Sequence, residues 1–212
     1  MIDAIILARK GSKRIKDKNI KKINGKRLID FTFDAAFKSK LISRIICFTD
    51  DLRIKKFTKN SNIIFPVKRP KNLSNDTTTS DDTLYFLIKE LVKKKLVSSD
   101  FILLQPTSPL RNSKIIDHAI NVYKKKKIKY LASFKLNKKR IYKLNKNYAK
   151  SYNLKLYQPD GAIYICNTKD FLKNKKIVSR KSYPIFLNKK FTLDVDTIED
   201  FNKAKSILKN IK

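Results

Sequence analysis

The sequence predicts an α/β fold in which one mostly parallel sheet is doubly wound, with helices on both of its faces. Apolar runs of strand length alternate with amphipathic segments of helical period along most of the chain. The run Phe-Ile-Leu-Leu at 101–104 is apolar at every position, which is typical of a strand buried on both faces of a parallel sheet. The 212 residues suffice for a sizeable core, and we expect a single domain over 1–212.

The expected strands share a short apolar or β-branched run, and they lie at 2–7, 44–49, 63–65, 101–104, 130–134, 162–166 and 191–195. The expected helices share apolar residues at helical spacing, and they lie at 26–39, 51–58, 82–94, 113–123 and 198–208. Thr197 and Asp200 have the spacing of a capping box, which predicts the start of the last helix. From 135 to 158 the alternation lapses, and this basic, tyrosine-bearing stretch is consistent with a hairpin that leaves the sheet.

The composition is strongly basic, with a formal net charge of +33. The lysines are spread over the whole chain and the spacings of nucleic-acid-binding motifs are missing, so we expect no nucleic-acid partner; a basic nucleic-acid-binding module is the alternative from another class. No apolar stretch approaches the roughly 20 residues of a membrane span, and no signal-peptide pattern opens the chain, so we expect a cytoplasmic protein without a membrane partner. Cys47 and Cys166 fall within strand-like runs, where buried, reduced thiols are expected.

The loop after the first expected strand is rich in cations. Residues 8–19 read Ala-Arg-Lys-Gly-Ser-Lys-Arg-Ile-Lys-Asp-Lys-Asn, and Gly11 would let the backbone approach a ligand closely. The loop has neither the Walker spacing nor the three glycines of a dinucleotide fingerprint. We therefore expect a phosphate loop in which side-chain cations replace part of the usual backbone nest. An ordinary strand-to-helix turn would explain Gly11 by itself.

Asp194 and Asp196 flank Val195 at the end of the last expected strand. Residues i and i+2 of a strand point the same way, so both carboxylates can converge on one point while Val195 enters the core. Such a pair suits Mg²⁺, which takes one or two carboxylates plus ligand phosphates. The alternative is that Asp196 merely precedes a helix and Asp194 is solvated. Together with the cationic loop, the pair indicates phosphate chemistry.

Two further polar groups are expected near this site. Arg69 opens the polar loop 69–80 and could contact a base or a phosphate, and Gln105 directly follows the buried strand. In doubly wound sheets ligands bind beyond the carboxyl ends of the strands, where the segments 9–19, 69–80, 105–111 and 194–197 are all expected to lie. The single histidine, His118, falls in none of them, so a histidine-dependent mechanism has no support.

Five segments together resemble the acylneuraminate cytidylyltransferases, the CMP-sialic acid synthetases. They are 8–19 with Asn-Gly-Lys at 24–26, Arg-Pro at 69–70, Leu-Gln-Pro-Thr-Ser-Pro-Leu-Arg at 104–111, Gly-Ala-Ile-Tyr-Ile at 161–165 and Asp-Val-Asp-Thr at 194–197. The resemblance covers nearly the whole chain. It implies a Rossmann-like fold, a homodimer with 135–158 as a dimerisation arm, and Mg²⁺ as cofactor. The implied reaction joins CTP to a nine-carbon 2-keto acid sugar, giving a CMP-sugar and pyrophosphate.

The resemblance also implies residue roles. The catalytic residues would be Arg9, Lys18, Asp194 and Asp196, with the two aspartates as metal ligands. The nucleotide-binding residues would be Ala8, Arg9, Gly11, Ser12, Lys13, Lys18, Asn19, Arg69 and Ser80. The sugar-binding residues would be Gln105, Gln158, Asp160 and Tyr164.

Three positions depart from the family pattern. Leu7 stands where the family usually has Pro, and Asp160 replaces the usual Asn. Gln158 occupies a position that is often an Arg holding the sugar carboxylate. The changes at positions 158 and 160 leave the identity of the acidic sugar undetermined. They do not affect the residues expected to bind CTP. The segment 104–111 favours a sialic or legionaminic acid type of sugar, and a pseudaminate or Kdo type is the alternative.

Overall fold

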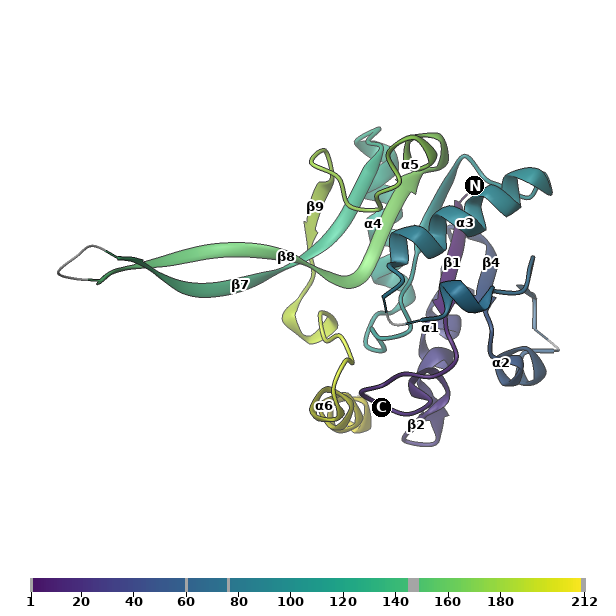
Figure 1. Cartoon of the computed structure of the whole chain (residues 1–212), viewed down its shortest axis with the longest axis horizontal. Helices are drawn as coiled ribbons and strands as arrows, with labels where there is room; N and C mark the ends of the chain where they lie inside the picture. Colours follow the sequence, from purple (N-terminus) through teal and green to yellow (C-terminus); the bar gives the residue numbers. More distant parts are fainter. Residues whose placement is uncertain (1, 60, 76, 145–148, 211–212) are drawn as a thin grey trace.

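A seven-stranded sheet forms the body of the protein (Figure 1). The structure is a computed structural model that describes residues 2–59, 61–75, 77–144 and 149–210. The strands are β1 (Ile2–Ala8), β4 (Ile42–Thr49), β5 (Ile63–Ile64), β6 (Asp100–Leu103), β7 (Tyr130–Leu144), β8 (Ala149–Asn167) and β9 (Tyr183–Phe186). Their order is β5-β4-β1-β6-β8-β7-β9. β8 runs antiparallel to β6 and β7 while the other neighbours are parallel, which confirms a mostly parallel sheet.

Helices cover both faces of this sheet. They are α1 (Leu28–Phe37), α2 (Leu52–Phe57), α3 (Ser80–Lys93), α4 (Ser113–Lys125), α5 (Thr168–Asn174) and α6 (Ile198–Lys209). Ile6 of β1 packs in the same cluster as Phe33 of α1 and residues of α4. The preceding residue, Ile5, packs on the other face with Leu87 of α3 and residues of α5. Successive strand residues point to opposite faces, so a sheet covered on both sides requires the continuous apolar run of β1.

A third, smaller cluster joins the last helix to the loop after β1. Ile15 of that loop is buried with Val195, Phe201 and Ala204, the last two from α6. The short elements β2 (Lys22–Ile23), β3 (Lys26–Arg27) and the 3₁₀ turn η1 (Lys18–Ile20) lie between the loop and α1. Two further 3₁₀ turns, η2 (Lys71–Leu73) and η3 (Lys189–Phe191), lie in other loops. The cluster places the segment before α6 beside the cationic loop.

β7 and β8 form a long hairpin that leaves the body of the protein (Figure 1). Their pairing runs from Tyr130 and Cys166 in the sheet to Leu144 and Ala149 near the tip, with a register irregularity between Ala132 and Phe134. The hairpin expected over 135–158 is therefore confirmed as a hairpin.

The prediction of a strand at 191–195 is wrong. Those residues form the end of η3 and then a segment without regular secondary structure, in which the Val195 N–H donates to the carbonyl of Thr107 (2.7 Å). The place beside β7 belongs instead to β9, which the sequence analysis did not predict because Pro184 interrupts its pattern. β9 is an edge strand, where a residue without an N–H is tolerated. The helix expected from 26 begins at Leu28 because Lys26 and Arg27 pair with β2.

Both cysteines are buried and carry free thiols, as predicted. Burial raises the pKa of each thiol, so both stay protonated and unreactive. Phe37 and Val92, two apolar residues within the expected helices 26–39 and 82–94, are exposed rather than buried. Within the described ranges no helix has the length and apolar character needed to cross a bilayer.

Candidate active site

The four polar segments meet in one cleft beyond the carboxyl ends of β1 and β6, as predicted. The cleft has a volume of about 350 Å³. Its polar lining comes from the loop after β1 (Arg9, Lys18, Asn19), the segment before and at the start of α3 (Arg69, Thr78, Thr79, Ser80), the loop after β6 (Gln105, Thr107) and the segment before α6 (Asp194, Asp196). Cations and carboxylates therefore face one cavity.

A second cavity of about 320 Å³ adjoins the first, and the loop after β1 encloses it. Arg9, Lys18 and Asn19 line both cavities, while Gly11, Ser12, Lys13 and Arg14 line the second. Gly11 has φ +74°, and a Cβ there would meet no atom within 4 Å, so the backbone conformation rather than space requires glycine. The side chain of Asn19 donates to the carbonyl of Arg9 (3.0 Å) and closes the loop on itself. Ala8, the buried last residue of β1, leads into this loop.

Asp196 is held by cations at the cleft. Lys18 Nζ lies 3.1 Å from its Oδ1 and 3.0 Å from the carbonyl of Val195, and Arg14 Nη1 lies 3.6 Å from its Oδ2. The capping box of α6 is confirmed, but Thr197 and Asp200 build it. Because the Asp196 side chain takes no part in the cap, its carboxylate is available to the cleft.

Asp194 presents a buried carboxylate to the same cleft. Among the described residues its Oδ1 has no hydrogen-bond partner. Burial raises the pKa of Asp194, a side-chain hydrogen bond from Thr107 opposes that shift, and the charge of Asp196 adds to it. Both aspartates line the cleft and Val195 between them is fully buried, so the expected alternation holds although the segment is not a strand. The described chain has no group of three or more His, Cys, Asp and Glu side chains that could hold a metal.

Arg69 is buried, so its side chain does not lie on an exposed surface loop. Its guanidinium donates to the carbonyl of Leu73 through Nε (3.0 Å) and Nη2 (2.5 Å) and to Thr83 Oγ1 (3.3 Å). Burial lowers the pKa of Arg69 to about 10. Arg69 lines the cleft, and most of its donors hold the loop before α3 in shape. Ser80, the first residue of α3, lies on the same wall.

Three of the four expected sugar-binding residues do not line this cleft. Gln105 does, but Gln158 lies exposed on the hairpin, where it accepts from Asn137 Nδ2 (2.9 Å). Tyr164 pairs with Leu103 and packs in the core under α3, and burial raises the pKa of its hydroxyl. Asp160 is buried, and its Oδ1 accepts from the Ser133 hydroxyl and the Ala162 N–H.

Arg111, the last residue of the segment 105–111, is a buried cation for which the sequence predicted no separate role. It donates to the carbonyl of Ala162 (2.8 Å), the Thr32 hydroxyl (2.8 Å) and the carbonyl of Gln105 (3.2 Å). Burial lowers the pKa of Arg111 to about 9, and the charge of Asp160 opposes that shift. Asp160 and Arg111 thus grip the N–H and the carbonyl of the same residue, Ala162.

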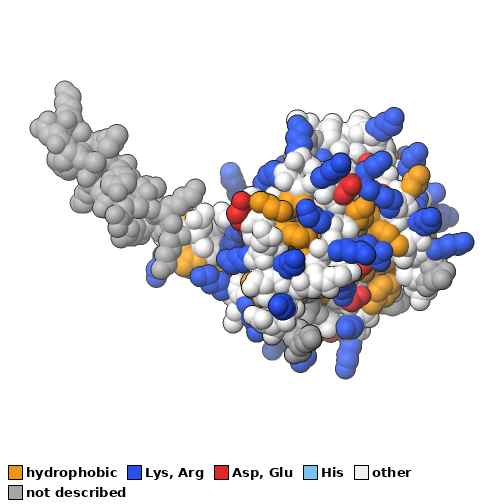
Figure 2. Space-filling model, turned by 90° about the horizontal axis from the view of Figure 1, so that it is seen from below, with side chains coloured by type: hydrophobic (Ala, Val, Ile, Leu, Met, Phe, Trp, Pro, Cys, Tyr) orange, Lys and Arg blue, Asp and Glu red, His pale blue; other side chains and the backbone are white. Residues whose placement is uncertain are grey.

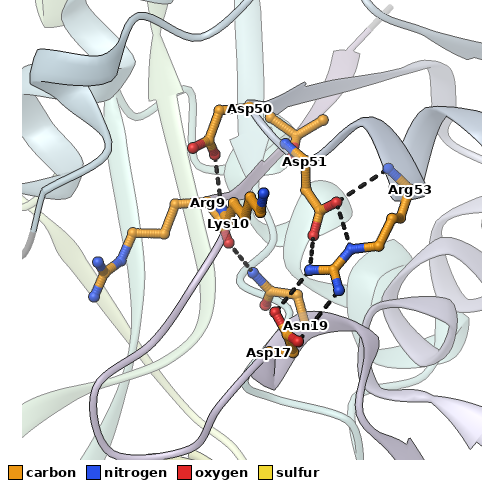
Figure 3. Close-up of polar contacts among 8 residues, drawn as sticks. Arg9, Lys10, Asp17, Asn19, Asp50, Asp51 and Arg53 are labelled. Atoms are coloured by element: carbon orange, nitrogen blue, oxygen red, sulfur yellow. Dashed lines mark hydrogen bonds and ion pairs between the residues drawn. The ribbon is translucent and has the colours of Figure 1, made fainter.

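A second missed cluster lies behind the cationic loop (Figure 3). Asp50 and Asp51 follow β4 directly, and with Arg53 they contact Lys10 and Asp17 of the loop. Polar residues at the carboxyl ends of strands predicted the segments of the cleft, and Asp50 and Asp51 show the same pattern after β4. Nothing in the sequence marked Arg53 as their partner.

Comparison with known proteins identifies the family. The family model described as "Cytidylyltransferase" matches residues 4–211. An N-acylneuraminate cytidylyltransferase of Streptococcus agalactiae serotype V is 32% identical over 214 residues, covering 93% of this chain and 51% of the relative. The chain thus spans about half the length of the first curated relatives it matches.

Shorter relatives match almost end to end. The CMP-N,N'-diacetyllegionaminic acid synthase of Legionella pneumophila is 28% identical, with 97% of this chain and 95% of the relative covered. A pseudaminic acid cytidylyltransferase of Campylobacter jejuni is 29% identical with the same coverage. The solved structure of CMP:2-keto-3-deoxy-manno-octonic acid synthetase complexed with CTP shares the fold, with a TM-score of 0.68, 14% identity and coverage of 100% of this chain and 99% of that chain. The chain belongs to the cytidylyltransferase family.

Proposed function

We propose that this protein is a Mg²⁺-dependent enzyme that joins CTP to a nine-carbon 2-keto acid sugar of the sialic or legionaminic acid type and releases pyrophosphate. The observation that carries the proposal is the single cleft in which the cationic loop faces Asp194 and Asp196. Cations beside paired carboxylates suit a triphosphate that binds together with a divalent metal. Membership of the cytidylyltransferase family supports CTP as the nucleotide.

The loop after β1 would hold the triphosphate through Arg9, Ser12, Lys13 and Lys18. The anomeric hydroxyl oxygen of the sugar would bond to the α-phosphorus as the bond from that phosphorus to the α,β-bridging oxygen breaks, and the hydroxyl proton would pass to solvent. Pyrophosphate then leaves with the bridging oxygen. Such a transfer depends on alignment and charge neutralisation, which the loop cations supply without a strong protein base.

Asp194 and Asp196 would hold the metal. The unpartnered, buried Oδ1 of Asp194 is a hard anionic donor of the kind Mg²⁺ prefers. Two carboxylates, rather than a complete protein cage, suit an ion that keeps its waters and takes phosphate oxygens. Bound there, the ion would neutralise charge on the phosphates. The bond from Lys18 Nζ to Oδ1 of Asp196 holds that carboxylate at the cleft.

The sugar half of the site is proposed from fewer residues. Gln105 would contact the sugar from the floor of the cleft. Because Gln158 carries no charge, the sugar carboxylate needs another cation, for which exposed Lys155 and a lysine of a partner arm are candidates. The nearly end-to-end match to a pseudaminic acid cytidylyltransferase makes a pseudaminate-type sugar the second candidate.

The hairpin 135–158 is proposed to be the dimerisation arm of a homodimer. At its base, Phe134, Leu136, Tyr157 and Phe186 line a mostly apolar groove of about 580 Å³, which Lys135 and Lys189 also line. Tyr157 and Phe186 are 52% and 60% exposed although their rings lie 5.1 Å apart. A contiguous exposed apolar surface of this kind marks an interaction site.

The test is a substrate panel. Pyrophosphate release would be measured with CTP, Mg²⁺ and either N-acetylneuraminate, legionaminate, pseudaminate or Kdo, and repeated with ATP, GTP and UTP as controls. We expect CTP with a sialate- or legionaminate-type acid to give the fastest release. Pseudaminate or Kdo as the sole substrate would refute the proposed sialic or legionaminic acid type of sugar. If none of the four acids supports pyrophosphate release, the substrate is another acidic sugar.

The competing class, a nucleic-acid-binding module, makes the opposite prediction. In Figure 2 the lysine and arginine side chains are scattered over the visible face rather than gathered in one patch. An enzyme should gain thermal stability from CTP with Mg²⁺, whereas a nucleic-acid binder should show tight, salt-sensitive binding to arbitrary DNA or RNA. Tight, salt-sensitive binding to nucleic acid without any stabilisation by CTP and Mg²⁺ would overturn the proposed function.

A further inference from the structure

Arg53 joins the cationic loop to the sheet through two carboxylates (Figure 3). Its guanidinium donates to Asp51 through Nε (2.9 Å to Oδ1) and Nη2 (2.8 Å to Oδ2). The same group donates to Asp17 through Nη2 (2.7 Å to Oδ1) and Nη1 (3.2 Å to Oδ2). A planar guanidinium can satisfy two carboxylates in this way, which the point charge of a lysine cannot do.

One end of this bridge is rigid. Asp51 is buried at the carboxyl end of β4 and caps α2, its Oδ1 accepting from the backbone N–H of Arg53 (3.0 Å). The cap fixes the carboxylate, and the carboxylate in turn fixes the guanidinium. Arg53 therefore presents its remaining donors from a fixed point in the first turn of α2, just after β4.

The other end lies next to a residue of the cleft. Asp17 has a left-handed backbone (φ 54°, ψ 37°), a conformation that is uncommon outside glycine. Its carbonyl accepts from the N–H groups of Ile20 and Lys21 (both 3.0 Å) and so starts the η1 turn. The next residue is Lys18, which reaches Asp196 across the cleft. The place of Asp17 thus determines where Lys18 leaves the backbone.

The charge of Asp17 also needs an explanation. Residues 9–19 contain six cationic side chains, and Asp17 is their only acid. An acid in a loop that binds a polyanion opposes that binding unless a cation neutralises it. The side-chain hydrogen bond from Arg53 is the largest cause that lowers the pKa of Asp17 below its usual value. Asp17 is thus engaged by Arg53 rather than directed at a ligand.

A separate contact holds the other end of the loop. The N–H of Lys10 donates to Asp50 Oδ1 (2.6 Å), so the two consecutive acids after β4 fix the loop near residue 10 and, through Arg53, at residue 17. Ile15 between them is buried under α6. In Figure 3 the loop is a wide turn that leaves the sheet beside Lys10 and returns at Asp17, and the Arg9 side chain extends away from the cluster.

We propose that Arg53 is a positioning residue that orders the triphosphate loop before the nucleotide binds, by holding Asp17 and so Lys18. The inference rests on the proposed function. A loop fixed in advance loses less conformational freedom when its ligand arrives, so the bridge should strengthen binding of CTP. It should leave the sugar half of the site unaffected.

The experiment compares Arg53→Met, Asp17→Asn and the double variant with the wild type in steady-state assays and in CTP-binding titrations without sugar. We expect each single variant to raise KM and Kd for CTP about five- to tenfold, with kcat and the KM for sugar nearly unchanged. The double variant should be no worse than Arg53→Met, because both changes remove the same contact. Asp17→Asn keeps the cap of α2 and covers the case in which Arg53→Met folds poorly.

The matched control is Arg44→Met. Arg44 makes a comparable two-donor pair with Asp3 near the start of β4, at the opposite end of the sheet from the cleft. Its loss should lower the Tm and leave the KM for CTP unchanged. An equal rise in KM for this variant would mean that Arg53 acts only through global stability and would overturn the proposal.

A readout without nucleotide separates this proposal from the proposed function. Trypsin cuts after Lys13, Arg14 and Lys16, which lie between the two contacts, so Arg53→Met and Asp17→Asn should be cleaved there several times faster than the wild type. Unchanged cleavage and unchanged CTP affinity in an active enzyme would overturn the role of Arg53 alone. A wild type that neither binds nor uses CTP would instead overturn the proposed function, and the nucleotide role of Arg53 with it.

Discussion

Gly161 stands so close to Gln105 that a Cβ at position 161 would lie 2.8 Å from Oε1 of Gln105. The same Cβ would lie 3.5 Å from Oδ2 of Asp194. Gly161 also has φ +84°, a conformation that favours glycine. Space and backbone conformation therefore both require glycine where β8 passes the floor of the cleft.

The first prediction concerns this contact. Gly161→Ala should lower kcat/KM at least about tenfold, because the new methyl group displaces the amide of Gln105. Gly25→Ala is the matched control: Gly25 has the same φ of +84°, but a Cβ there meets nothing within 4 Å. Both changes should cost about 1–2 kcal/mol of stability. Equal activity in the two variants would show that the contact with Gln105 has no functional role.

The second prediction concerns the acidic pair. Asp194→Asn and Asp196→Asn should each reduce turnover on the order of 100-fold or more, because the metal loses an anionic ligand. Circular dichroism should show an intact fold, since Thr197 and Asp200 cap α6 without either side chain. Thr197→Ala is the control, and it should lose about 1 kcal/mol of stability while keeping most of its activity. Near-normal turnover in both asparagine variants would make the pair structural.

The third prediction is a stability change with pH. Burial raises the pKa of Asp194 above 3.8, so the folded state binds its proton more tightly than the unfolded chain does. Ionised Asp194 therefore destabilises the fold, and this penalty grows as pH rises from 3.8 through the raised pKa. Without metal, Asp194→Asn should have a higher Tm than the wild type at neutral pH. The difference in Tm between the two proteins should vanish as pH falls toward 3.8. A Tm lower for Asp194→Asn than for the wild type at neutral pH would contradict a destabilising, buried charge at Asp194.

The fourth prediction separates two roles for Asp160. If Asp160 supports the buried guanidinium of Arg111, Asp160→Asn should lose about 1–3 kcal/mol in urea unfolding while the KM for sugar changes little. Asp34→Asn breaks a half-buried ion pair with Lys26 at the protein surface and should lose under about 1 kcal/mol. A large rise in the KM for sugar at unchanged stability would instead support a direct contact with the sugar.

The fifth prediction concerns assembly. The protein should be a dimer by light scattering at micromolar concentration, and Tyr157→Lys should shift it toward monomer by adding a further cation to a groove that Lys135 and Lys189 already line. Leu52→Lys, at an exposed position on α2, is the control and should leave the mass unchanged. A wild-type monomer with full activity would remove the role of the arm.

Local patterns predicted the frame of the fold well. The buried strands and the α6 capping box follow from residues close in sequence, and the strand ends identified the cleft. The patterns failed where a contact with a residue distant in sequence determines the local structure. Pro184 interrupts the strand pattern of β9, whose place depends on pairing with β7. The run 191–195 has a strand-like pattern, but in the described part of the chain it pairs with no strand, and the Val195 N–H donates to the carbonyl of Thr107. Asp17 and Arg53 are 36 positions apart, and nothing local marks them as partners.

The bond between Lys18 and Asp196 spans 178 positions of the chain. The cationic loop packs through Ile15 on residues as late in the sequence as Ala204. During synthesis the loop is therefore made long before Asp194 and Asp196, and its cations stay unopposed by these carboxylates until the segment 194–196 has left the ribosome. Products that stop before Asp194 would carry a complete β1 but lack both carboxylates of the cleft, so they should show no partial activity.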